Sequence, residues 1–163
     1  MVLGMSLATF TLVHVIISLI GIVAGLVVMF GMLASDRKPG LTAIFLLFTI
    51  LTSATGFLFP FTQLLPSHMI GILSLVLLAI ACIALYAMKL SGSWRWIYVV
   101  TALLSLYFNV FVLVIQSFFK IPALTAVAPG NPPSGPVFAV VQGIVLVFFV
   151  LMIIGAWRRF KPA

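Results

Sequence analysis

The hydrophobic positions of this chain form five long runs that are separated by short polar breaks. A bilayer core is about 30 Å thick, so a helix that crosses it needs about 20 apolar residues at a rise of about 1.5 Å each. Each run is long enough to form such a helix. The predicted helices are Met5–Leu33, Leu41–Phe59, a third from just after Pro66 to Leu90, Trp94–Phe119 and Val137–Trp157.

The breaks contain helix-terminating residues. Pro39 and Gly40 end the first break, and Pro60 stops the second helix. Ser67 is the predicted N-cap of the third helix, because a serine hydroxyl can accept a hydrogen bond from a free N–H of the first turn. The last connection, 120–136, holds five of the nine prolines. Its first half is compatible with a short interfacial helix, and the whole segment is expected to be a plain linker or, alternatively, a lid.

Composition supports a membrane protein. Of 163 residues, 65% are hydrophobic and 6% are charged, which is too little polar surface to cover a water-soluble globule. We therefore expect an all-α integral membrane bundle of five transmembrane helices that forms a single domain over residues 1–163. The one cysteine, Cys82, has no partner for a disulfide within the chain.

The basic residues predict the orientation. Seven of the eight Lys and Arg residues fall at one end of the predicted helices, and only Lys120 falls at the other. Because cytoplasmic loops carry an excess of Lys and Arg, the N-terminus should lie outside and the C-terminus in the cytoplasm of a bacterial-type inner membrane. The net charge of +7 would suggest nucleic acid in a soluble domain, but beside apolar runs it indicates contacts with membrane lipids and no nucleic acid.

The strongest hydrogen-bonding side chains gather in the half of the bundle opposite the basic residues. His14 and His68 both lie about 28 to 32 Å from the basic end of their helices. Because a polar group in lipid is costly unless it is satisfied, this imbalance predicts an outward-facing pocket for a small lipophilic ligand. The residues expected to line it are His14, Ser18, His68, Asn109, Gln116 and Gln142.

A redox protein is the runner-up. Two imidazoles at one depth on separate helices could bind haem b through its iron, or a quinone, with Gly71 leaving room for a flat macrocycle and Lys120 meeting a propionate. A separate metal site is not expected, since the only acidic residue, Asp36, lies at the other end.

Enzyme chemistry finds little support, because the outer half offers only two His and one Lys and no paired carboxylate or nucleophile motif. We expect no catalytic residues. A third interpretation is an accessory subunit or homo-oligomer that packs through Gly21 and Gly25, a GxxxG pair on the first helix.

The predicted orientation can be tested with reporter fusions in a bacterial host. A green fluorescent protein fused after Ala163 should fluoresce, because it folds in the cytoplasm, whereas alkaline phosphatase fused there should be inactive. Fusions after Gly130 should show the reverse. Active phosphatase at the C-terminus would contradict the orientation.

Overall fold

The structure, a computed structural model, describes residues 2–59, 66–130 and 133–162. This part of the chain is all-α, and five of its helices are long and apolar enough to cross a membrane, as predicted. The elements are α1 (Leu7–Leu33), α2 (Pro39–Gly56), α3 (Pro66–Cys82), the π-helix η1 (Ile83–Ala87), α4 (Trp94–Lys120), α5 (Pro122–Val127) and α6 (Pro136–Arg159).

The start of α1 is set by a side-chain cap. The Ser6 hydroxyl accepts a hydrogen bond from the backbone N–H of Thr9 at 3.2 Å, which satisfies a donor that has no partner within the helix. Met5, the predicted first residue, instead exchanges two backbone hydrogen bonds with Val2. The helix therefore begins two residues later than the apolar run suggests.

Both ends of the second helix and the start of the third differ from the prediction. The second helix begins earlier, at Pro39, because proline suits a first helical turn, and it ends at Gly56, before Phe59. Ser67 lies inside α3 and is not its N-cap. The stop predicted at Pro60 lies outside the described residues.

The third predicted helix does not continue as an α-helix to Leu90. After Cys82 it widens into η1, where the N–H of Met88 bonds the carbonyl of Ile83 at 2.8 Å, five residues earlier. Lys89 and Leu90 then adopt left-handed backbone angles, with φ of 51° and 59°, and end the element. A π-turn is rare and often marks a functional position.

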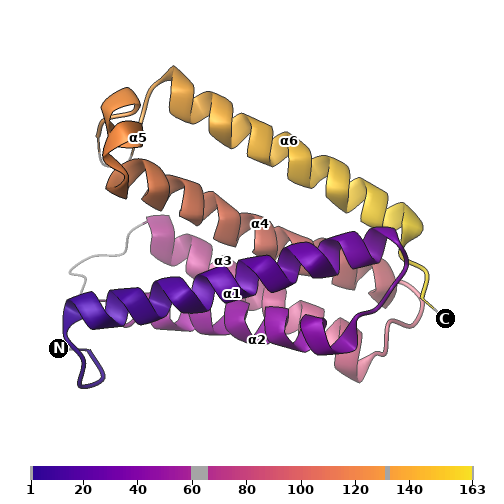
Figure 1. The fold of residues 1–163 in the computed structure, drawn as a ribbon. Helices are drawn as coiled ribbons and strands as arrows, with labels where there is room; N and C mark the ends of the chain where they lie inside the picture. Colours follow the sequence, from indigo (N-terminus) through magenta and orange to yellow (C-terminus); the bar gives the residue numbers. More distant parts are fainter. Residues whose placement is uncertain (1, 60–65, 131–132, 163) are drawn as a thin grey trace.

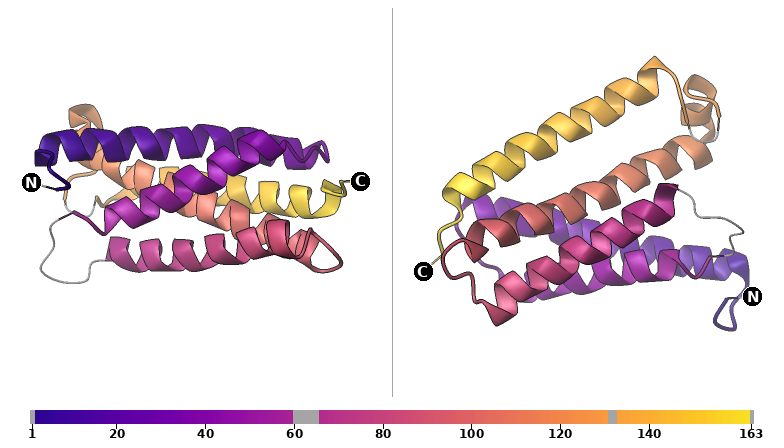
Figure 2. Two further views of the ribbon diagram at one scale, coloured as in Figure 1. Left: turned by 90° about the horizontal axis from the view of Figure 1, so that it is seen from below. Right: turned by 180° about the vertical axis from the view of Figure 1, so that it is seen from behind.

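Successive long helices run in opposite directions, which brings the N-terminus to one end and the C-terminus to the other (Figure 1). Helix α4 is central and contacts all the other elements. The connection after α4 contains the short helix α5, in agreement with the predicted helical first half. Helix α6 converges with α4 near the C-terminus and diverges from it toward α5, as two views agree (Figures 1 and 2).

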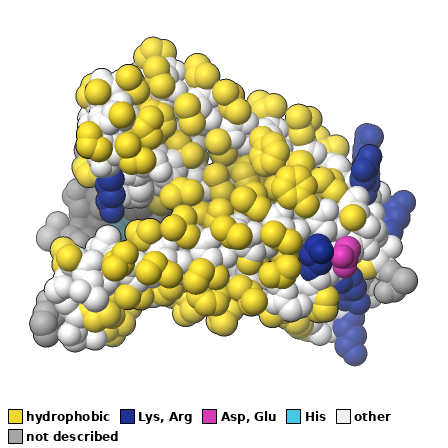
Figure 3. Space-filling view, viewed as in Figure 1, with side chains coloured by type: hydrophobic (Ala, Val, Ile, Leu, Met, Phe, Trp, Pro, Cys, Tyr) yellow, Lys and Arg dark blue, Asp and Glu magenta, His cyan; other side chains and the backbone are white. Residues whose placement is uncertain are grey.

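We call the end that carries seven cations the basic end; Figure 3 shows Lys and Arg gathered there. The hydrophobic core occupies the half of the bundle next to it. Its largest members lie in the second half of α1, the first halves of α2 and α4, and the end of α6. They include Met29, Met32, Phe45, Tyr98, Leu103, Leu106 and Phe160, none of which exposes more than 2% of its surface.

Small residues allow α1 to approach its neighbours closely. A Cβ on Gly25 would lie 2.7 Å from Leu106 Cδ1 and 2.8 Å from Phe45 Cδ1, and one on Gly21 would lie 3.2 Å from Thr49 Oγ1. Both glycines are buried against α2 or α4. This GxxxG pair therefore packs within the chain, and contact with another subunit stays a prediction.

Helix α6 is fastened at the basic end. The Arg95 guanidinium donates to the carbonyl oxygen of Phe160 at 2.6 Å and to that of Trp157 at 3.3 Å. These carbonyls lie at the end of a helix, where they have no intrahelical partner and a cation is favoured. The backbone N–H of Lys161 also bonds the Ser35 hydroxyl at 2.8 Å, which joins the C-terminal segment to the α1–α2 connection.

The packing at Gly25 predicts a position-specific loss of stability. Gly25→Leu should lower the thermal midpoint of the detergent-solubilised protein, because overpacking a tight contact costs about 1–3 kcal/mol. Gly143→Leu is the matched control, since nothing lies within 4 Å of its added Cβ. Equal midpoints for the two variants would contradict the close approach.

Candidate functional site

The half of the bundle opposite the basic end contains a cavity of about 560 Å³. Side chains from α1, α2, α3 and α4 line it, and Ile121 closes the α4 side. Along α4 the lining runs from Ser105 to Lys120, a rise of about 22 Å. Figure 3 shows the molecule hollowed at this end, beside the single basic side chain there. The cavity thus begins where the packed core ends and opens away from the basic end.

His14 enters the cavity from α1 and is held by α2. Its Nδ1 lies 2.7 Å from the Thr55 hydroxyl oxygen. The same hydroxyl lies 2.6 Å from the Leu51 carbonyl oxygen. If the hydroxyl donates to that carbonyl, its oxygen accepts from Nδ1–H and Nε2 carries the free lone pair; if it donates to Nδ1, Nε2 carries the hydrogen. In both arrangements Thr55 holds Nδ1, and Nε2 is the ring nitrogen left for a ligand.

His68 also lines the cavity, from the first turn of α3, and is 7% exposed. Its ring lies 5.6 Å from that of Phe57, between centroids. A Cβ on Gly71 would lie 3.1 Å from the same phenylalanine ring. The space that Gly71 was predicted to leave for a macrocycle is therefore filled by Phe57.

Most hydroxyls along the cavity donate to their own helix. Ser18 donates to Val15 at 2.8 Å, Thr52 to Phe48 at 2.7 Å and Ser105 to Ala102 at 2.7 Å, in each case to the carbonyl oxygen. Because these hydrogens are already used, the hydroxyls can offer only their oxygen lone pairs to anything in the cavity. The ordinary packing role of Ser and Thr in membrane helices accounts for this group.

Two polar atoms of the lining have no partner. Among the described residues, the buried side-chain atoms without a hydrogen bond are Thr49 Oγ1, Asn109 Nδ2 and Gln142 Oε1. The first two belong to cavity-lining residues. Burying an amide N–H without an acceptor costs free energy in a lipid environment. Asn109 is therefore the strongest indication that the cavity takes a hydrogen-bond acceptor.

The remaining predicted residues fall in different places. Gln116 and Lys120 line the outer part of the cavity and are exposed. Gln142 is not in the lining, because α6 contributes no residue to it; its amide donates to the Phe111 carbonyl at 3.2 Å. Thus five of the six residues predicted to bind the ligand come together around one cavity: His14, Ser18, His68, Asn109 and Gln116.

Sequence reasoning missed Thr55 and Ser74. Thr55 lies within hydrogen-bond distance of His14 Nδ1, and Ser74 is 4% exposed in the cavity wall. Thr52 and Thr55 are three residues apart on one helix face, and this spacing could have indicated Thr55. Ser74 could be identified only once the rotation of α3 about its axis was known.

The cavity offers few options for bond-making chemistry. In the described part of the chain, no three His, Cys, Asp or Glu side chains are close enough to hold a metal ion together. What it offers is a hydrogen-bond donor at Asn109, a ring nitrogen at His14 and a cation, Lys120, at the end far from the basic end. Such a set can orient a bound molecule.

No protein-family model matches the chain, and searches of curated proteins and of solved structures find no match. The function is therefore inferred from the geometry of the cavity.

The unpartnered amide predicts that Asn109→Leu stabilises the ligand-free protein. Removing a buried donor that has no acceptor should raise the free energy of unfolding by about 1–3 kcal/mol, and with it the thermal midpoint in detergent. Thr52→Val is the control on the same wall, because it removes a hydroxyl that is already bonded and should bring no gain. A lower midpoint for Asn109→Leu would show that the amide has a partner.

Proposed function

We propose that this chain is a non-catalytic membrane protein whose cavity binds a small lipophilic ligand with a carbonyl or hydroxyl head group. In the orientation that the basic residues favour, the cavity opens to the outer side of a bacterial-type plasma membrane. The observation that carries the proposal is that the buried, unpartnered amide of Asn109 and the imidazole of His14 line one cavity.

The hydrogen-bonding inventory defines the head group. Asn109 Nδ2 calls for an acceptor, which a carbonyl or hydroxyl oxygen supplies, and a hydroxyl can bond His14 Nε2 in either tautomer. The other lining hydroxyls have mostly used their hydrogens within their own helices. A ligand with one or both of these groups would satisfy atoms that lipid tails leave unpaired.

The cavity walls favour an apolar body on that ligand. Val15, Ile70, Phe108, Val112 and Leu113 contribute aliphatic and aromatic surface between the polar positions. Ligand sites of several hundred cubic ångströms typically have mostly apolar walls with a few polar groups that fix orientation. Prenylated quinones, quinols and hydroxylated neutral lipids share this chemistry.

A haem b or quinone redox protein that uses His14 and His68 is the second candidate. The position of both imidazoles on one cavity favours it, with Lys120 at the outer end as a cation for a propionate. The ring of Phe57, packed over Gly71 and close to His68, counts against a macrocycle at that histidine. A role as an accessory subunit would have to use a face other than the buried Gly21 and Gly25.

The proposal predicts that a defined class of molecule copurifies with the protein. Chloroform extracts of the purified protein, analysed by mass spectrometry, should contain a neutral lipid or isoprenoid quinone in excess over a control membrane protein from the same host. Binding of a short-chain benzoquinol, kept reduced under argon and measured by equilibrium dialysis, should weaken about tenfold in His14→Phe and in Asn109→Leu. Each hydroxyl of the quinol can both accept and donate, and a tenfold change is the loss expected for one hydrogen bond in a dry site.

Thr101→Val is the matched control, because Thr101 is a buried α4 residue outside the cavity lining. Thermal midpoints identify any variant that has lost its fold. Wild-type ligand content and affinity in both cavity variants would overturn the proposal. An absorption spectrum of the same samples tests the second candidate: after expression with added haem precursor, a Soret band that disappears in His14→Phe would assign the cavity to haem.

A further inference from the structure

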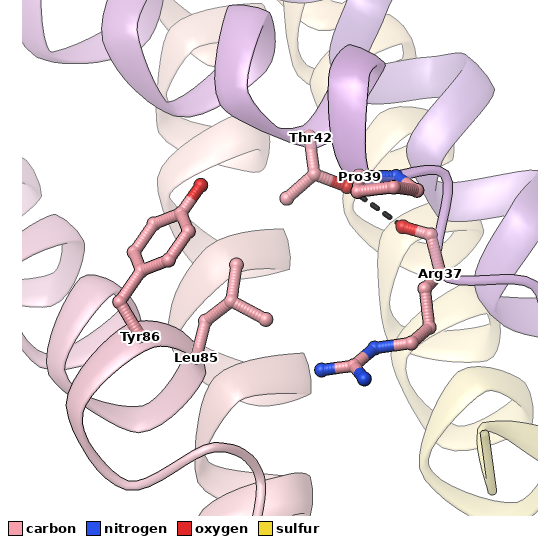
Figure 4. A pocket seen from close by; sticks show the side chains of 5 residues that line it. All are labelled: Arg37, Pro39, Thr42, Leu85 and Tyr86. Carbon is pink, nitrogen blue, oxygen red and sulfur yellow. Dashed lines mark hydrogen bonds between the residues drawn. The ribbon is translucent and has the colours of Figure 1, made fainter. Parts of the chain in front are cut away.

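A second cavity, of about 340 Å³, lies at the basic end and plays no part in the proposed function. It is formed where the α1–α2 connection faces the π-helix η1, and it is lined by Arg37, Pro39, Thr42, Leu85 and Tyr86. Figure 4 shows the Arg37 side chain and the Tyr86 ring on opposite sides of it, with Leu85 between them. The guanidinium of Arg37, the hydroxyl of Tyr86 and the aliphatic side chain of Leu85 therefore lie around one cavity at the basic end.

The Arg37 guanidinium has no partner in the described part of the chain. Its neighbours in sequence bond each other instead: Lys38 Nζ lies 3.2 Å from Asp36 Oδ2, and the Lys38 N–H donates to Asp36 Oδ1 at 3.2 Å. The hydrogen bonds from the Lys38 side chain and backbone lower the pKa of Asp36, so this carboxylate stays ionised at neutral pH and paired. The only acidic side chain of the protein is thus not available to Arg37.

The backbone that carries Arg37 is fixed. The Thr42 hydroxyl, from a residue only 2% exposed, donates to the Arg37 carbonyl oxygen at 2.9 Å (Figure 4). Pro39 begins α2 directly after the loop. These contacts hold the Arg37 backbone beside the cavity, and its side chain is exposed.

The opposite wall depends on the π-turn. Leu85 and Tyr86 both belong to η1, where the extra residue per turn rotates their side chains relative to a regular helix. Tyr86 is 56% exposed, so its hydroxyl can reach a ligand at the surface. The helices that form the cavity also carry exposed apolar residues, as expected beside lipid: Leu41 and Ile44 on α2, and Ile83 on η1.

We propose that this cavity binds a phosphate group, with Arg37 as its cation and Tyr86 as a hydrogen-bond donor. A guanidinium forms short, charge-assisted bonds with phosphate oxygens and suits their geometry. Basic pockets between helices at the cytoplasmic boundary commonly receive phospholipid head groups, and the apolar surround suits acyl chains. The same chemistry would accept free phosphate, so the two sources are separated by experiment.

The experiment measures binding of the first phosphatidylglycerol molecule to delipidated, detergent-solubilised full-length protein by native mass spectrometry. Arg37→Gln should raise the Kd about tenfold, the effect of losing one hydrogen bond to a charged group. Tyr86→Phe should raise it less. Arg158→Gln, which removes the same charge from the same end but outside the cavity, should leave the Kd unchanged.

Two further arms identify the source of the phosphate. Diacylglycerol has the same acyl chains and no phosphate, and it also matches the head group proposed for the larger cavity, so its Kd should be unchanged in Arg37→Gln. Inorganic phosphate that displaces the lipid at millimolar concentration assigns the site to free as well as lipid phosphate, and failure to displace it assigns the site to the lipid.

Wild-type affinity in Arg37→Gln, or equal losses in Arg37→Gln and Arg158→Gln, would overturn the phosphate site, since the interaction would then be general attraction to the basic end. Thermal midpoints should be the same for all three variants, because each altered side chain is largely exposed. Should Tyr86→Phe have no effect while Arg37→Gln does, the tyrosine has no role as a donor and that part of the proposal is wrong.

Discussion

The close approach of α1 to α2 and α4 at Gly25 is the constraint on which the rest of the bundle depends. The hydrophobic effect contributes little when helices associate in lipid, so the favourable free energy of association must come from van der Waals contact. With no Cβ at Gly25, Phe45 and Leu106 can press against the α1 backbone. This contact lies in the packed core next to the basic end, and the cavity lined by His14 and Asn109 lies beyond it.

The surroundings of the polar side chains therefore differ between the two halves of the bundle. In the core half, polar side chains such as Thr101 bond their own helix and are covered by apolar neighbours. In the other half, the same kind of hydroxyl lines a cavity together with His14 and an amide that has no partner. Incomplete packing and incomplete hydrogen bonding therefore occur at the same place, which is the expected condition of a site that is completed by another molecule.

The sequence predicted those features that depend on the length and the charge of a segment. Five apolar runs became five long helices, and the cations fell at one end because the runs alternate in direction. It did not predict features set by the rotation of one helix against another. Gln142 was placed with the cavity on depth alone, yet α6 turns it toward Phe111. Gly71 was taken for empty space, but the chain beyond α2 brings Phe57 over it.

The sequence also did not predict the local backbone conformation of α3 and η1. Nothing in the residues Ile83–Ala87 distinguishes a π-turn from a regular helix, since every member of the segment is an ordinary helix former or apolar residue. Ser67 matched a capping pattern, but the helix had already begun at Pro66. Such outcomes depend on which backbone donors find acceptors, and composition gives no measure of that.

The attachment of α6 has a mechanical consequence. Arg95 and the buried ring of Phe160 clamp the helix at its last turn, whereas toward α5 its axis departs from that of α4 (Figure 2). Toward α5, the Gln142 amide still donates to the Phe111 carbonyl oxygen at 3.2 Å, and the rings of Phe118 and Phe138 lie 5.4 Å apart between centroids. Helix α6 is therefore tied to α4 near both of its ends, so a sideways load from the surrounding acyl chains is shared between the two attachments.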